Sequence, residues 1–149
     1  MRFLLVDRIL SYTPWKDGRG FKFASSTEQF WRSTPNGLIM PPSLVIEMLL
    51  QTGTWLLYFS SDRCLRGILV SIESIQFGRH VRPGDALIAD VTIDSRSDDV
   101  IVMSGTVAIG GDAAVEAAGI LCTVVAADQL DDPVHLARMA SWLIRADEK

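Results

Sequence analysis

The chain has 149 residues, of which 48% are hydrophobic, 21% charged and 8% aromatic. This composition is typical of a globular protein that can bury one sizeable core, so it excludes disordered and collagen-like classes. Fourteen Lys and Arg against eighteen Asp and Glu leave a formal net charge of −4. Because a mildly acidic chain lacks the basic surface of a general nucleic-acid-binding protein, we expect no nucleic acid among its partners.

Cysteine and histidine are too few for a disulfide framework or a metal site. Cys64 and Cys122 form no CxxC motif, and His80 and His135 lie far apart in the sequence. We therefore expect two buried or idle thiols in a reducing compartment, with no metal and no cofactor. The first residues lack the apolar length of a signal peptide, which favours a cytoplasmic location.

In chain order, the pattern first predicts two short strands, over residues 3–12 and 18–24. A helix over residues 41–60 follows, and its two initial prolines suit a first turn, where amide hydrogens have no partner within the helix. This helix is apolar on nearly every side, which predicts burial all round. The apolar run that contains it, residues 38–59, includes Glu47 and Gln51. An ionisable residue there favours a buried helix over a membrane span.

The second half of the chain predicts an antiparallel meander of four strands and a final helix. The strands are expected at residues 67–77, 87–93, 100–109 and 114–126. The helix is expected at about residues 131–145, with Asp131 or Asp132 as N-cap and Trp142 anchoring it to the sheet. The fold class is therefore α+β, with one long central helix wrapped by a curved antiparallel sheet, and the whole chain is expected to form a single domain.

Several short stretches resemble the beta-hydroxyacyl-acyl-carrier-protein dehydratases of the FabZ/FabA type, which have the hotdog fold. Residues 4–10 resemble the opening strand of that family, and residues 39–41 followed by Glu47 and Gln51 resemble the start of its central helix. Residues 77–85, ending in Pro-Gly-Asp, resemble its strand-turn-strand signature, and residues 115–117 resemble part of its last strand. These matches occur in the family's order.

The resemblance implies a hotdog dimer, of two identical or two different subunits, whose sheets join edge to edge and which can form higher oligomers. In the family, an acyl chain carried by acyl carrier protein enters a tunnel at the dimer interface. A His of one subunit and a Glu of the other then remove water from a beta-hydroxyacyl thioester. This chemistry needs a base, an acid and a donor for the enolate-like oxygen, which a backbone amide at the start of the central helix supplies.

Two positions depart from the family pattern. The family's catalytic stretch, HFPGxPxMPG, aligns without a gap to residues 33–42, and the Glu falls at Glu47. The catalytic His is therefore replaced by Ser33, which is a poor proton acceptor without a partner base. The Gly that supplies the amide donor is replaced by Pro42, which has no N–H. Both changes predict an impaired dehydratase site.

Other residues of the aligned stretches are assigned roles through the resemblance. The substrate-binding candidates are Gln51, Pro42, Met40 and His80, and the candidates for docking an acidic carrier protein are Arg79, Arg82 and Arg66. Glu47 is either a remnant of the catalytic acid or a carboxyl that is hydrogen-bonded for structural reasons. Ser33 could act as a nucleophile only with a base, for which His80 is the candidate.

Three hypotheses of function remain open at this point. The chain is a non-catalytic protein that binds a carrier-linked acyl group or pairs with an active dehydratase subunit. Alternatively, it is an active dehydratase, or a thioesterase that uses Glu47 and a water molecule. Thirdly, it is an assembly subunit without a ligand, for which a filled tunnel would be the signature.

Overall fold

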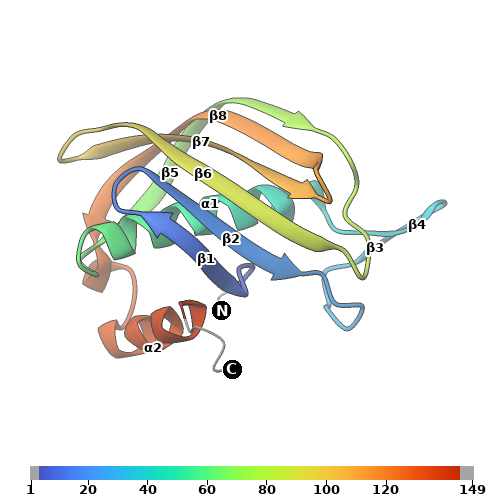
Figure 1. Cartoon of the computed structure of the whole chain (residues 1–149), viewed down its shortest axis with the longest axis horizontal. Coiled ribbons are helices and arrows are strands. Elements are labelled where there is room, and N and C mark those ends of the chain that lie inside the picture. Colours follow the sequence, from blue (N-terminus) through green and yellow to red (C-terminus); the bar gives the residue numbers. More distant parts are fainter. Residues whose placement is uncertain (1–3, 145–149) are drawn as a thin grey trace.

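The computed structural model describes residues 4–144, and these form one large sheet around a central helix (Figure 1). Six strands are hydrogen-bonded in the order β1-β2-β6-β7-β8-β5, all of them antiparallel to their neighbours. The elements are β1 (Arg8–Thr13), β2 (Asp17–Phe23), β3 (Arg32–Thr34), β4 (Gly37–Ile39), α1 (Pro42–Ser60), β5 (Leu65–Phe77), β6 (Ala86–Arg96), β7 (Val100–Ile109), β8 (Asp112–Ala126), the short 3-10 turn η1 (Ala127–Gln129) and α2 (Pro133–Leu143).

The central helix α1 begins at the two prolines, as the sequence predicts. Pro41 is the N-cap residue and Pro42 is the first helical residue, so neither needs an amide partner. The predicted hotdog arrangement of a helix wrapped by a curved antiparallel sheet is confirmed. No helix within residues 4–144 has both the length and the apolar character needed to cross a bilayer.

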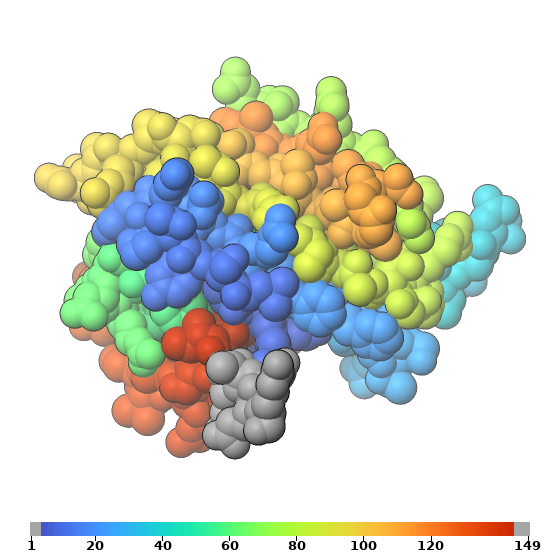
Figure 2. Space-filling view, in the orientation of Figure 1, coloured from blue at the N-terminus to red at the C-terminus, as the bar shows by residue number. Residues whose placement is uncertain are grey.

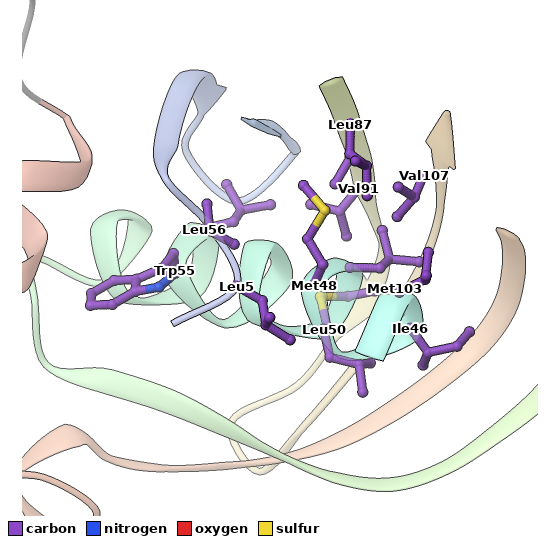
Figure 3. Close-up of a cluster of buried hydrophobic side chains, with 14 of the residues drawn as sticks. Leu5, Ile46, Met48, Leu50, Trp55, Leu56, Leu87, Val91, Met103 and Val107 are labelled. Carbon is purple, nitrogen blue, oxygen red and sulfur yellow. The ribbon is translucent and has the colours of Figure 1, made fainter. Parts of the chain in front are cut away.

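The hydrophobic core lies between α1 and the concave face of the sheet (Figure 3). Met48 and Met103 are almost completely buried, and Met48 points toward Leu87 and Val91 on β6. Leu50 points away from this group, and Trp55 lies farther along the helix toward its C-terminal end. The core therefore fixes which side of α1 faces the sheet and which side is left for other contacts.

The predicted four-strand meander is wrong for its first strand. Strands β6, β7 and β8 are consecutive neighbours, but β5 pairs with β8, from Leu65 opposite Ala126 to Phe77 opposite Val115. Apolar alternation identifies a strand but does not specify which strand it pairs with. With 13 residues, β5 is similar in length to β8, which has 15. As a result, β5 becomes one edge of the sheet and β1 the other.

A small hairpin, β3–β4, precedes α1 and was not predicted. Its two strands have three residues each, too few to show a period of two. Gly37 adopts a positive φ of 106°, and the Thr34 hydroxyl donates to the Gly37 carbonyl, which closes the turn. Figure 2 shows this hairpin, in cyan, as a projection from the side of the molecule.

The C-terminal helix α2 forms where it was predicted, but its Trp does not anchor it. The side chain of Asp132 caps the helix by accepting from the Val134 amide. Leu136, Ala140 and Leu143 are buried, whereas Trp142 is 60% exposed. The three buried residues are spaced by four and three positions, so they form one face of the helix, and this face does not include Trp142. The predicted ends at residues 3 and 145 lie outside the described residues.

Close contact between α1 and β2 makes a glycine necessary at one position. A Cβ at Gly20 would lie 2.6 Å from the Thr52 hydroxyl oxygen, and Thr52 is fully buried. A Cβ at Gly18, on the same face of the same strand, would lie 3.5 Å or more from Leu56, an ordinary contact.

We expect Gly20→Ala to lower the free energy of unfolding by about 1–3 kcal/mol, the usual cost of overpacking a core. Gly18→Ala should be neutral or slightly stabilising, because it restricts the unfolded chain without a clash. Urea denaturation of both variants measures the difference. Equal stabilities would show that β2 and α1 do not approach this closely.

Candidate functional site

A groove of about 600 Å³ runs beside α1, between that helix, β5 and α2. Four polar residues of α1 line it, at spacings of four, four and three residues, and these spacings place them on one helix face. They are Ser43, Glu47, Gln51 and Thr54. The prediction that α1 is buried on all sides is therefore wrong, because Ser43 and Glu47 are exposed in the single chain. The spacing was present in the sequence but was masked by the many apolar residues around it.

Gln51 connects Glu47 to the backbone of the N-terminal segment. Its amide nitrogen donates to the Glu47 carboxylate over 3.4 Å, and its amide oxygen accepts from the Leu5 backbone N–H over 2.8 Å. Because both ends of the Gln51 amide are engaged, its orientation is fixed. Gln51 thus holds one carboxylate oxygen of Glu47 within the groove.

Arg66 lies in the same groove, two helical turns along α1 from Glu47. Its guanidinium group lies 4.5 Å from the centre of the Trp55 ring and donates to the Thr54 hydroxyl. Arg66 does not lie with Arg79 and Arg82, with which the sequence analysis had grouped it for docking. Its position gives one part of the groove a positive charge, whereas Glu47 gives another part a negative charge.

The other three predicted substrate-binding residues meet in a second, much smaller cavity of about 30 Å³. Met40, Pro42 and His80 line it together with Arg79. Met40 is buried, and its amide donates to the Val81 carbonyl, which ties the start of α1 to the segment before β6. The structure therefore separates the predicted substrate-binding residues into two sets, with Gln51 in the large groove and the other three in the small cavity.

Ser33 lies on β3, in the projecting hairpin, where it is paired with Leu38 and exposed. Among the described residues that line the groove, Glu47 is present and Ser33 is not. One chain thus does not bring the two predicted catalytic positions into one cavity.

Arg79 and Arg82 both contact Asp85. Arg79 also forms an ion pair with Asp112 at 3.5 Å, and Arg82 donates to the Asn36 carbonyl of the β3–β4 turn. Arg79 is exposed and Arg82 partly so. These contacts fix the Arg82 guanidinium group at the β3–β4 turn and hold that of Arg79 beside Asp85 and Asp112. The docking role of both residues stays a prediction.

The two cysteines differ in exposure. Cys122 lines the groove and is buried, and burial raises the pKa of its thiol. Cys64 is exposed. Of the two thiols expected to be buried or idle, Cys122 is therefore buried, and whether Cys64 is idle stays a prediction.

Comparison with known proteins identifies relatives over most of the chain. Residues 1–118 match the family model of the FabA-like domain. The chain is 34% identical over 117 residues to a 3-hydroxyacyl-acyl-carrier-protein dehydratase FabZ of Caldanaerobacter subterraneus, covering 77% of this chain and 83% of that protein. It is 36% identical over 117 residues to the protein of the same name in Rickettsia massiliae, covering 76% of this chain and 81% of that protein.

Solved structures show the same hotdog fold at low sequence identity. The dehydratase heterocomplex ApeI:P from Xenorhabdus doucetiae matches with a TM-score of 0.59 and 13% identity, covering 91% of this chain and 88% of that one. The protein smu.793 of Streptococcus mutans, bound to acetyl CoA, matches with a TM-score of 0.63 and 13% identity, covering 85% of this chain and 92% of that one.

The difference in exposure between Cys64 and Cys122 predicts that only Cys64 is alkylated rapidly. At neutral pH, iodoacetamide should modify Cys64 in the folded protein and leave Cys122 intact, because Cys122 is buried and its raised pKa keeps it protonated. Mass spectrometry after brief treatment counts the modified thiols, and Cys64→Ser should abolish rapid modification. Rapid alkylation of Cys122 in that variant would contradict the buried position.

Proposed function

This chain belongs to the FabA-like domain family, and on that premise we propose that it binds a beta-hydroxyacyl thioester carried by acyl carrier protein without dehydrating it efficiently by itself. It does so as one hotdog domain in fatty-acid or polyketide-type acyl metabolism. The observation that carries the proposal is that Glu47 lies in an open groove, whereas the two aligned positions Ser33 and Pro42 lack the His and Gly of the family.

The groove supports the binding part of the proposal. Its apolar walls include Leu44, Leu50 and Leu69, which suit an acyl chain, and its volume is that of a small-molecule site. Glu47 and Gln51 supply hydrogen-bonding groups that can hold the beta-hydroxyl and thioester end. An open groove of this size also disfavours the assembly subunit without a ligand.

The replacements at Ser33 and Pro42 support the loss of chemistry. A serine hydroxyl cannot take the proton that imidazole takes, and general acid–base catalysis contributes a factor of about 10² to 10⁴. Pro42, the first residue of α1, has no N–H, whereas in the family the amide at this position donates to the thioester oxygen. Loss of one such donor costs about 2.7–4 kcal/mol of transition-state stabilisation.

Within residues 4–144 the outer edge of β5 pairs with no other strand, and this edge supports a partner subunit. This strand is 13 residues long and exposes Ile68, Leu69, Val70, Ile75 and Phe77, whereas the opposite edge, β1, has only six residues. A long apolar edge is a template for strand pairing with another chain. One structural neighbour is a dehydratase heterocomplex. A partner with the family's His could therefore complete a site with Glu47, and Arg79 and Arg82 are candidates for docking the acidic carrier protein.

A second candidate function is thioester hydrolysis or residual dehydration by Glu47. The exposed carboxylate, held by Gln51 in the groove, is placed to act on a water molecule. Pro42 argues against both reactions, since each needs a donor for the developing oxyanion.

Restoring the two replaced groups should restore dehydration. We expect the purified wild type to give no more than traces of enoyl product from a beta-hydroxyacyl carrier-protein thioester. Ser33→His combined with Pro42→Gly should raise the rate by about 10² or more, and adding Glu47→Gln should remove that gain. Fast turnover by the wild type would overturn the proposal. Failure of a folded double variant would show that residues 33–42 are aligned incorrectly.

Charge on the β5 edge should prevent subunit pairing. Val70 is 58% exposed, and Val70→Lys places a charge in the expected interface. Light scattering should show a dimer for the wild type and a monomer for this variant. Leu10→Lys, at a residue 50% exposed on β1, is the matched control and should remain dimeric. Dissociation by Leu10→Lys alone would place the interface on the other edge.

A further inference from the structure

We propose that α2 and Arg66 together close the groove at the end away from Glu47, so that the protein binds acyl chains of short to medium length and excludes long ones. This inference rests on the proposed function, because it concerns the acyl chain bound in the same groove. It adds a determinant of chain length that lies partly outside the region shared with the family.

The groove runs along α1, so distances along it can be measured with the residues of that helix. From Ser43 to Trp55 the lining covers about 18 Å at the helical rise of 1.5 Å per residue. Glu47 lies near the beginning of this path, and Thr54, which Arg66 contacts, lies about 10 Å further along. If the thioester end lies at Glu47, an acyl chain that follows the helix reaches Arg66 at about the length of an octanoyl group.

Arg66 is a poor neighbour for the end of an apolar chain. Its guanidinium group lies over the Trp55 ring with Nε and Nη1 buried, so it occupies this end of the groove, and a methyl group that met it would form no hydrogen bond. Asp131, from the segment before α2, lines the same groove and adds a second polar group. The charged end therefore disfavours a chain that extends beyond it.

Helix α2 supplies the remaining wall. Leu136 and Met139 line the groove together with Trp55, and α2 lies below the C-terminal half of α1 (Figure 1). In the space-filling view, α2 in red adjoins the green end of α1 (Figure 2). The family match ends at residue 118, so this wall belongs to a segment outside the match.

Met139 is the residue through which this wall can be tested. It is only partly buried, and its flexible side chain can be shortened or enlarged at low cost to the fold. Trp142 is on the same helix, but it points outward and does not line the groove. A change at Trp142 thus controls for general effects on α2.

The experiment measures binding of three non-hydrolysable pantetheine amides, which carry butyryl, octanoyl and tetradecanoyl chains, by calorimetry on the full chain. We expect the wild type to bind the octanoyl compound at least about tenfold more tightly than the tetradecanoyl compound. Met139→Ala should improve tetradecanoyl binding about tenfold, the usual effect of a changed pocket wall. Met139→Trp should weaken octanoyl binding by a similar factor and leave butyryl binding unchanged. Trp142→Ala should resemble the wild type.

The outcomes separate this inference from the proposed function. If the wild type binds none of the three compounds, the proposed acyl binding fails. If it binds them and both Met139 variants keep the wild-type order of affinities, acyl binding stands and the role of α2 is wrong. If Met139→Trp does not fold, the result for Met139→Ala alone decides, with Trp142→Ala as its control.

Discussion

The packing of α1 against the sheet determines which of its side chains line the groove of the candidate site. The Thr52 side chain of the helix lies so close to β2 that a side chain at position 20 would clash with it. This contact and the core around Met48 fix the rotation of the helix about its axis. The face of α1 away from β2, beside β5, then carries Glu47 and Gln51. Their polar groups therefore line a groove and are not buried in the apolar core.

The fold was largely predictable from the sequence, because its signals are local. The two prolines at the start of α1 and the apolar patterns of the strands each act over a few residues. The pairing of β5 with β8 was not predictable in this way, since it joins strands far apart in the chain. The three-residue strands of the β3–β4 hairpin were too short to give a pattern. Trp142 was misplaced because a large apolar residue was assumed to face inward, although the spacing of Leu136, Ala140 and Leu143 selects another face.

The candidate site was predicted in part. Alignment with the family identified Glu47 and Gln51, and the structure shows them hydrogen-bonded in a groove. Arg66 was expected on a docking surface because it is positively charged. The structure places its guanidinium group over Trp55, a contact that the sequence alone does not reveal. Met139 could not be assigned from the sequence, since only the tertiary position of α2 brings it to the groove. Under the proposed function, the groove binds the acyl group, and Ser33 and Pro42 stand where the family has two catalytic groups.

Binding without reaction is the central claim, and one measurement tests it directly. The purified protein is mixed with a beta-hydroxyacyl carrier protein, and native mass spectrometry follows both the complex and the mass of the bound acyl group. The account predicts a complex in which the hydroxyacyl group remains intact over many minutes. Loss of the mass of one water at an enzymatic rate, or the absence of any complex, would contradict it.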